Sequence, residues 1–142
     1  MSSTFSKSNA KTEVTFVRLE NRGDARGALY RLPSHLIELL GPIGDIHFGE
    51  IRPGATRGNH AHAGSAELIL LEWGDCGQIA YDNGKGKPVA VVEVEGSGAA
   101  ALFLPPHCAH AFRNNGNVVM EFTSIPSSPF DITDVIRRNL LV

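Results

Sequence analysis

Hydrophobic and β-branched residues along the chain fall into short runs, and glycine, proline or asparagine separates each run from the next. Several runs, such as TEVTFVRLE at 12–20, alternate with the period of two that is typical of strands. Many short strands at this spacing favour an all-β barrel or sandwich. The predicted strands cover 12–20, 28–33, 45–51, 66–74, 76–82, 87–96, 100–106, 110–114 and 118–125.

Two segments have a helical pattern instead. SHLIELLG at 34–41 predicts a short helical turn, which Ser34 caps and Gly41 ends. DITDVIRRNLL at 131–141 predicts a second short helix, because four apolar positions fall on one face: Ile132, Val135, Ile136 and Leu140. We expect this C-terminal helix to close one end of the barrel.

The chain has the length of one domain. Residues 1–12 are rich in Ser, Lys and Asn and lack hydrophobic periodicity, so they are predicted to form a disordered tail. The whole chain has 142 residues and is 42% hydrophobic, which is enough to fill one core. Residues 13–142 are therefore predicted to form a single domain.

Charge and cysteine content narrow the class of protein. Lys and Arg number 13 against 15 Asp and Glu, so the basic surface of a nucleic-acid-binding protein is not expected. No apolar run approaches the roughly 18 residues that span a bilayer, and the first residues lack the apolar centre of a secretion signal. Cys76 and Cys108 lack CxxC spacing and are expected to be free thiols. The sequence predicts a soluble, cytoplasmic protein.

One constellation of side chains predicts chemistry. Residues two apart on a strand point to the same face, so His60 and His62 present both imidazoles to one side. A turn at 63–65 returns Glu67 to the same interior, and His110 on another strand supplies a fourth group. Three imidazoles and a carboxylate suit one divalent transition metal, such as Zn, Fe, Mn, Ni or Co. A metal-free pocket, in which these histidines act as acid and base, is the alternative.

Five further side chains are candidates for substrate binding or proton transfer. Arg57 and Arg26 either bind a diphosphate, because guanidinium groups match phosphate oxygens, or are solvated turn residues. Tyr30 and Tyr81 lie on predicted strands, where each either donates a proton to an enolate or packs with its hydroxyl satisfied. His47 lies one strand before the histidine pair and either lines the cavity or is exposed.

The histidine segment resembles a known family. The first cupin motif, G(X)5HXH(X)4E(X)6G, is matched at all its positions: Gly54, His60, His62, Glu67 and Gly74. The resemblance implies a single cupin jelly-roll β-barrel whose ligand positions hold the metal.

The second cupin motif, G(X)5PXG(X)2H(X)3N, is matched less completely. Pro105, His110 and Asn114 match it, whereas His107 replaces its inner glycine and Gly98 lies one residue too far upstream. The metal-ligand position, His110, is intact, so only the local turn departs from the pattern.

Within the RmlC-like cupin superfamily the chain resembles the nucleotide-sugar branch. GDARGALYRLP and IRPGATRGNHAHAG are similar to the dTDP-4-keto-sugar 3,4-ketoisomerases and to the cupin domain of capsular-polysaccharide UDP-sugar reductases. The tail FDITDVIRRNLL resembles the D-x-x-D-x-I-R ending of the ketoisomerases. The ketoisomerases generally lack a metal and carry Gln in place of Glu67, whereas the capsular type holds zinc. The departure at Glu67 favours zinc as the metal.

This resemblance implies an isomerase or epimerase that acts on a nucleotide-activated 4-keto-sugar in polysaccharide biosynthesis. A dioxygenase-type or hydrolytic metal enzyme and a non-catalytic small-molecule-binding cupin are the alternatives. A homodimer is expected, because the strand at 12–20 presents a sheet edge that a partner can cover. The candidates are His62, His47 and Tyr81 for catalysis, Arg57, Arg26 and Tyr30 for substrate binding, and His60, His62, Glu67 and His110 for the metal.

Overall fold

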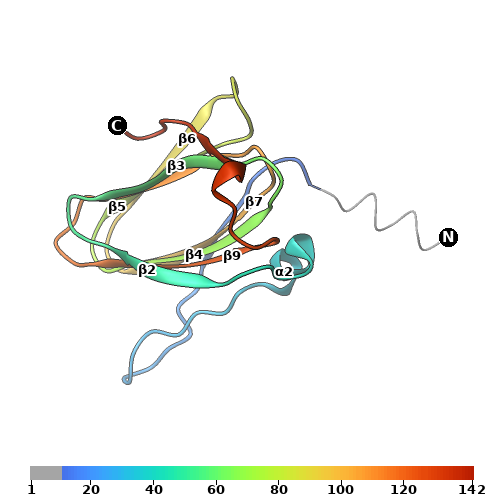
Figure 1. Ribbon diagram of the computed structural model, residues 1–142. Coiled ribbons are helices and arrows are strands. Elements are labelled where there is room, and N and C mark those ends of the chain that lie inside the picture. The colour runs from blue at the N-terminus through green and yellow to red at the C-terminus, as the bar shows by residue number, and fades with distance from the viewer. Residues whose placement is uncertain (1–10) are drawn as a thin grey trace.

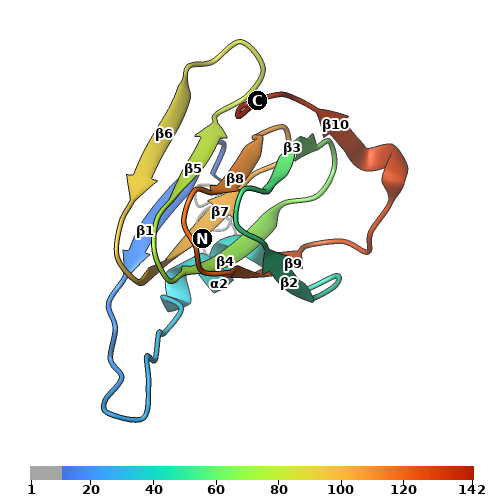
Figure 2. The same cartoon turned by 90° about the vertical axis from the view of Figure 1, so that its left-hand side faces the viewer.

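The computed structural model describes residues 11–142, which form two five-stranded antiparallel sheets packed face to face (Figures 1 and 2). Most of the predicted disordered tail, residues 1–10, lies outside the described residues. The first sheet has the order β1 (Thr15–Leu19), β7 (Gly98–Leu104), β4 (Glu67–Trp73), β9 (Met120–Pro126) and β2 (His47–Ile51). The second has the order β10 (Val135–Arg137), β3 (Thr56–His62), β8 (His110–Asn114), β5 (Gly77–Asp82) and β6 (Val89–Val94). The all-β prediction is confirmed.

Alternation along the strands divides the barrel interior into an apolar half and a polar half. On β4, Ile69, Leu71 and Trp73 point inward and are at most 3% exposed. The next inward position toward the start of β4 is Glu67, and Ser124 is an inward position near the end of β9; both are buried. Because the two strands are antiparallel neighbours, these polar positions meet at one end of the barrel.

A short helix covers part of the outer face of the first sheet. Helix α2 (Ser34–Leu40) packs its buried Leu36 and Leu40 against apolar residues of β4 and β7. Gly41 ends the helix with a positive φ of 73°, as predicted. The predicted cap is wrong, because Pro33 occupies the N-cap position and no side chain caps the helix. Within residues 11–142 no helix has the length and apolar character needed to cross a membrane.

The predicted strand at 28–33 is wrong. This segment belongs to a projecting arm, residues 20–32, which extends away from the barrel in both views (Figures 1 and 2). The arm is held by its own contacts, a bridge between Asp24 and Gly27 and a 2.7 Å hydrogen bond from Arg22 N to Leu29 O. No neighbouring strand among the described residues pairs with 28–33, so the extended pattern does not become part of a sheet.

The predicted helix at 131–141 is also wrong. A single 3-10 turn, η1 (Ile132–Asp134), is followed by strand β10, which pairs with β3 in the register Val135 to His62. Asp131 starts the turn by accepting a 3.0 Å hydrogen bond from Thr133 N. Pairing with β3 satisfies backbone groups at the edge of the second sheet, and this tertiary gain overrides the weak helical periodicity. We call residues 131–142 the C-terminal strap.

Candidate functional site

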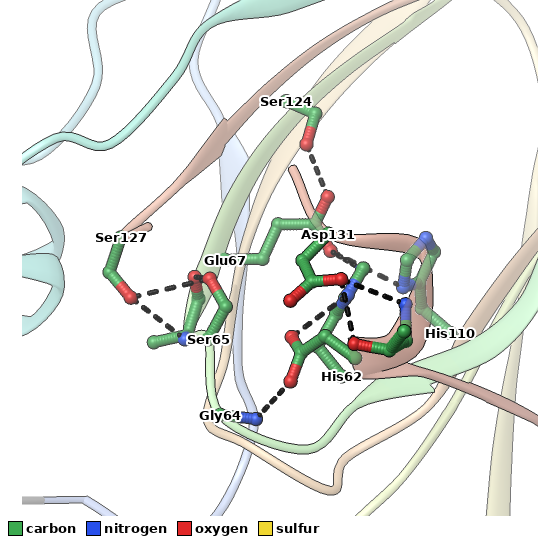
Figure 3. A network of polar contacts seen from close by, with 11 residues as sticks. His62, Gly64, Ser65, Glu67, His110, Ser124, Ser127 and Asp131 are labelled. Carbon is green, nitrogen blue, oxygen red and sulfur yellow. Dashed lines mark hydrogen bonds and ion pairs between the residues drawn. The ribbon is translucent and has the colours of Figure 1, made fainter. Parts of the chain in front are cut away.

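Four side chains meet at the polar end of the barrel, and Figure 3 shows three of them: His62, Glu67 and His110. The four come from three strands: His60 and His62 from β3, Glu67 from β4 and His110 from β8. The His60 ring centre lies 5.2 Å from that of His62 and 5.0 Å from that of His110. The predicted constellation is therefore assembled in space.

A β-bulge shapes the strand that carries the two histidines. The register between β3 and β8 shifts between Gly58 and His60, and Asn59 adopts a positive φ of 57°. A Cβ on Gly58, whose φ is 95°, would lie 2.7 Å from the carbonyl oxygen of His110, so only glycine permits this approach. Simple strand alternation predicted that the histidines share a side; the bulge next to them is a detail that alternation does not predict.

Glu67 is the buried acid of the site, with only 5% of its surface exposed. Its Oε2 accepts a short hydrogen bond from the Ser124 hydroxyl. Its Oε1 has no hydrogen-bond partner among the described residues and lies 3.6 Å from His62 Nε2 and 4.0 Å from His110 Nδ1. His110 Nδ1 is buried and likewise has no partner within 11–142. An unpaired buried polar atom costs about 1–3 kcal/mol, so the pair is poised to take up a proton, a cation or a polar ligand atom.

Burial keeps two of the histidines neutral at neutral pH. Desolvation lowers the pKa of His110 to about 4, although the charge of Glu67 opposes the shift. Desolvation also lowers the pKa of His60, again against Glu67 and with the help of His62. Neutral imidazoles can accept a proton or bind a cation.

Asp134 completes the site, although the residue-by-residue reading of the sequence did not select it. Its Oδ2 lies 3.5 Å from His62 Nδ1, and its Oδ1 accepts a 2.6 Å hydrogen bond from Gly64 N. His62 is thereby placed between two carboxylates, Asp134 at Nδ1 and Glu67 at Nε2. The signal that could have found Asp134 is the second acid of the D-x-x-D tail, which was compared with the ketoisomerases as a motif only.

Two cavities open onto the cluster. The larger, of about 350 Å³, is lined by His60, His110, Arg57 and Phe122 among others. The smaller, of about 120 Å³, lies beside the C-terminal strap and is lined by His62 and Asp134 among others. His47, His60 and Glu67 line both, so the two cavities meet at the histidine cluster.

Two of the other predicted residues reach this space. His47 lines both cavities from β2. Arg57 lines the larger cavity, where its Nε donates a 2.8 Å hydrogen bond to Glu50 O and its guanidinium lies 5.4 Å from the Phe122 ring centre.

Three predicted residues do not line these cavities. Tyr81 on β5 is the cross-strand neighbour of His110, but its ring stacks on Phe16 at 6.1 Å and lines neither cavity. Arg26 is at the tip of the arm, where it pairs with Asp24 at 2.6 Å. Tyr30 faces a different cavity, on the outer face of the first sheet. Within residues 11–142, Arg26 and Tyr30 are not brought to the histidine cluster, whereas Tyr81 lies beside His110 without reaching the cavities.

The side chains were tested for their fit to a metal ion. The donor set, three imidazoles and a carboxylate, has the right chemistry, and its two unpaired atoms lack partners. No group of three or more His, Cys, Asp or Glu residues within 11–142 is arranged to hold a metal ion, however. The metal site therefore stays a prediction, which the chemistry of the donor set supports.

Comparison with known proteins gives matches among solved structures alone. Neither a protein-family model nor a curated protein sequence matches the chain. A dTDP sugar isomerase from Desulfovibrio desulfuricans G20 superposes with a TM-score of 0.70 at 17% identity, covering 87% of this chain and 82% of that one. The sugar 3,4-ketoisomerase QdtA from Thermoanaerobacterium thermosaccharolyticum, in complex with TDP, gives 0.65 at 17% identity and 89% coverage of both chains.

A third structure extends the likeness to epimerases. ChmJ, a 3'-monoepimerase from Streptomyces bikiniensis in complex with dTDP-quinovose, gives a TM-score of 0.71 at 18% identity, covering 91% of this chain and 71% of that one. Identity at this level shows the fold and no more. This chain shares the fold of these three structures, a jelly-roll β-barrel of the cupin type that the sequence motifs predicted.

Proposed function

We propose that this protein is an isomerase or epimerase that moves a proton beside the ketone of a nucleotide-activated 4-keto-sugar. The observation that carries the proposal is the position of His62, which lies between the carboxylates of Asp134 and Glu67 and lines the smaller of the two cavities. The cupin fold shared with dTDP-sugar isomerases and epimerases supports the same substrate class. Polysaccharide biosynthesis is the expected context.

The chemistry begins with the acidity of a C–H bond next to a carbonyl. His62 takes the proton from that carbon, and the C–H bonding electrons move to the ketone oxygen as an enolate. The two carboxylates beside the His62 ring stabilise the imidazolium that forms. Protonation by solvent at the opposite face, with loss of the first proton from His62 to solvent, inverts the carbon. Return of the proton to the carbonyl carbon, with transfer of the neighbouring hydroxyl proton to the enolate oxygen, exchanges ketone and hydroxyl.

The larger cavity offers groups for the rest of the substrate. Arg57 presents a guanidinium for the diphosphate, and the Phe122 ring beneath it limits how the guanidinium turns. His47, at the junction of the cavities, is in a position to donate a hydrogen bond to the enolate oxygen.

Proton NMR in heavy water tests the proposal. The substrates are dTDP- and UDP-4-keto-6-deoxyglucose, and the signal at carbon 3 is followed. We expect the wild-type protein to accelerate its loss, His62→Asn to abolish the acceleration, and His47→Asn to reduce it. If neither nucleotide sugar exchanges at high protein concentration, the proposal is wrong, and the oxygenase and binding alternatives take its place.

As a second candidate we propose that His60, His62, Glu67 and His110 bind a divalent transition metal, with zinc first. The unpaired Glu67 Oε1 and His110 Nδ1 support this candidate, because both atoms lack a partner in the buried site. Metal-bound His62 has one ring nitrogen occupied, so the two candidates make opposite predictions. A chelator leaves proton exchange unchanged if His62 is the free base, and removal of an essential metal stops it.

We also propose that the protein is a homodimer. Strand β1 is an edge strand of the first sheet, as the sequence predicted, and its outer backbone groups lack a strand partner within residues 11–142. The projecting arm carries Leu29, which is 54% exposed, and isolated two-stranded hairpins are marginally stable in water. A second copy that packs on β1 and the arm would cover both features.

A further inference from the structure

The C-terminal strap is fastened to the barrel by a buried ion pair. Arg138 donates from Nε to Asp82 Oδ2 at 2.8 Å and from Nη2 to Asp82 Oδ1 at 3.0 Å. Its Nη2 also donates to the carbonyl oxygen of His107. The Asp82 side chain is 3% exposed and also accepts hydrogen bonds of 3.0 Å from the backbone N–H groups of Gly84 and Ala109. The guanidinium therefore joins β5, the turn before β8 and the strap.

A second set of hydrogen bonds joins Asn59 to the C-terminal strap. The Asn59 side chain at the bulge accepts from Leu140 N at 2.8 Å and Leu141 N at 2.9 Å through Oδ1, and donates from Nδ2 to Leu141 O at 2.8 Å. The Asn59 backbone carbonyl accepts from Arg138 N at 2.9 Å. Asn59 tolerates the left-handed conformation that the bulge imposes, so one residue both forms the bulge and holds the strap.

The interactions of Arg138 and Asn59 determine the position of Asp134. Between them and Asp134 lies β10, whose three residues pair with β3 in the register Val135 to His62. Ala63 N donates to Asp134 O at 2.9 Å, and Gly64 N donates to its side chain at 2.6 Å. A strap held in this register sets the carboxylate of Asp134 against His62 Nδ1. A shift by one residue would turn the carboxylate to the other face of the strand.

A buried ion pair is weak evidence for a role in stability, because desolvation offsets most of its attraction. We propose that Arg138, Asp82 and Asn59 are positioning residues, which fasten the C-terminal strap so that Asp134 orients His62 for proton transfer. This inference rests on the proposed function of His62, and it adds a set of residues outside both cavities to the site.

A double-mutant cycle tests the proposal. We expect Arg138→Met to lower kcat for carbon-3 exchange about tenfold with little change in KM, because Arg138 acts through Asp134. In the Asp134→Asn background the same substitution should leave kcat unchanged, since the group it positions is gone. Arg138→Lys, which keeps one charge but not the paired geometry, should fall between. Arg52→Met, which removes an exposed arginine with a loose 3.9 Å ion pair to Glu50, is the matched control and should leave kcat unchanged.

Asn59→Gly is the second variant. Glycine adopts the positive φ of the bulge, so this variant removes the hydrogen bonds to the strap without straining β3. It should lower kcat in the wild-type background and leave it unchanged with Asp134→Asn. If the effects of Arg138→Met or Asn59→Gly multiply with that of Asp134→Asn, these residues do not act through Asp134, and the proposal is overturned.

A readout without substrate separates this inference from the proposed function. The ¹⁵N NMR signals of the His62 ring, recorded on chelator-treated protein, report the contact at Nδ1. Arg138→Met and Asn59→Gly should move these signals in the direction that Asp134→Asn moves them, and Arg52→Met should not. No exchange by the wild type together with these shifts overturns the proposed function but retains the positioning of Asp134. Unmoved ring signals overturn the positioning itself.

Discussion

Oε1 of Glu67 lies 4.0 Å from Nδ1 of His110 inside the barrel, and neither atom has a hydrogen-bond partner within residues 11–142. Folding usually satisfies buried polar atoms, because an unpaired one costs free energy. A pair of unsatisfied atoms, one on a carboxylate and one on an imidazole, is therefore the feature of this fold that most directly indicates a ligand-binding position.

Elemental analysis distinguishes a metal-binding site from a metal-free site. If the second candidate is right, purified protein reconstituted with zinc should hold about one equivalent, and His62→Ala should lose it while the barrel stays folded. Ser124→Ala is a control that removes a hydrogen bond to Glu67 but no donor from the set. Less than about one-tenth of an equivalent of any transition metal in the wild type contradicts the metal candidate.

The stability of metal-free protein should fall in mild acid. The folded-state pKa of His110 is about 4, below the ordinary value of 6.5, so between these pH values the unfolded chain binds more protons. The neutral His110 makes its full contribution to the free energy of unfolding above about pH 6.5. This contribution, of roughly 3 kcal/mol, is lost as the pH falls toward 4. Denaturant titrations at pH 4.5 and 7 measure it.

His110→Asn provides the comparison for this pH dependence. The variant has no titrating group at the position, so its free energy of unfolding should change less between the two pH values than that of the wild type. His35→Asn on the exposed side of α2 serves as control and should keep the wild-type difference. Equal pH dependence in His110→Asn and the wild type contradicts the assignment.

Arg57 should contribute to binding rather than to proton transfer. Arg57→Met should raise KM for a dTDP-4-keto-sugar about tenfold and change kcat by less than about twofold, because the diphosphate is bound equally in the ground and transition states. Steady-state kinetics measure both constants, and Arg52→Met controls for the loss of a nearby positive charge. A fall in kcat with an unchanged KM would assign Arg57 to the chemistry instead.

Light scattering tests the proposed dimer. At micromolar concentration we expect twice the 15.3 kDa mass of one chain, and Leu29→Asp in the arm should shift the protein toward the monomer. Val89→Asp, a substitution at the 45% exposed start of β6, is a control in the other sheet and should leave the mass unchanged. A monomer mass for the wild type would refute the dimer.

Sequence reasoning predicted the sheets well because alternation directly reflects the two-sided environment of a strand. On β4, every inward position from Glu67 to Trp73 is buried, which is the pattern that was read from 66–74. Spacing within the first cupin motif likewise predicted the meeting of His60, His62 and Glu67, since one strand and one short turn connect them. Local geometry was sufficient in both cases.

The predictions that failed concern segments whose conformation depends on distant contacts. The tail at 131–141 has helical periodicity, yet its backbone pairs with β3 and Arg138 reaches Asp82 on β5. The strand predicted at 28–33 has β propensity but no neighbour among the described residues. Asp134 was missed for the same reason, because its distance from His62 depends on a pairing that the sequence pattern does not reveal.

The pairing of β10 with β3 also bears on how the protein folds. Bringing Val135 beside His62 closes a loop of about 70 residues, and such long-range pairings form slowly because loop-closure entropy is lost before contacts compensate for it. Strand pairs such as β5 with β6, which are joined by a short connection, have less entropy to lose. The barrel pairings of β1 with β7 and of β2 with β9 close loops of similar length. The contact between Asp134 and His62 is therefore expected to form together with these long-range pairings, after local pairs such as β5 with β6.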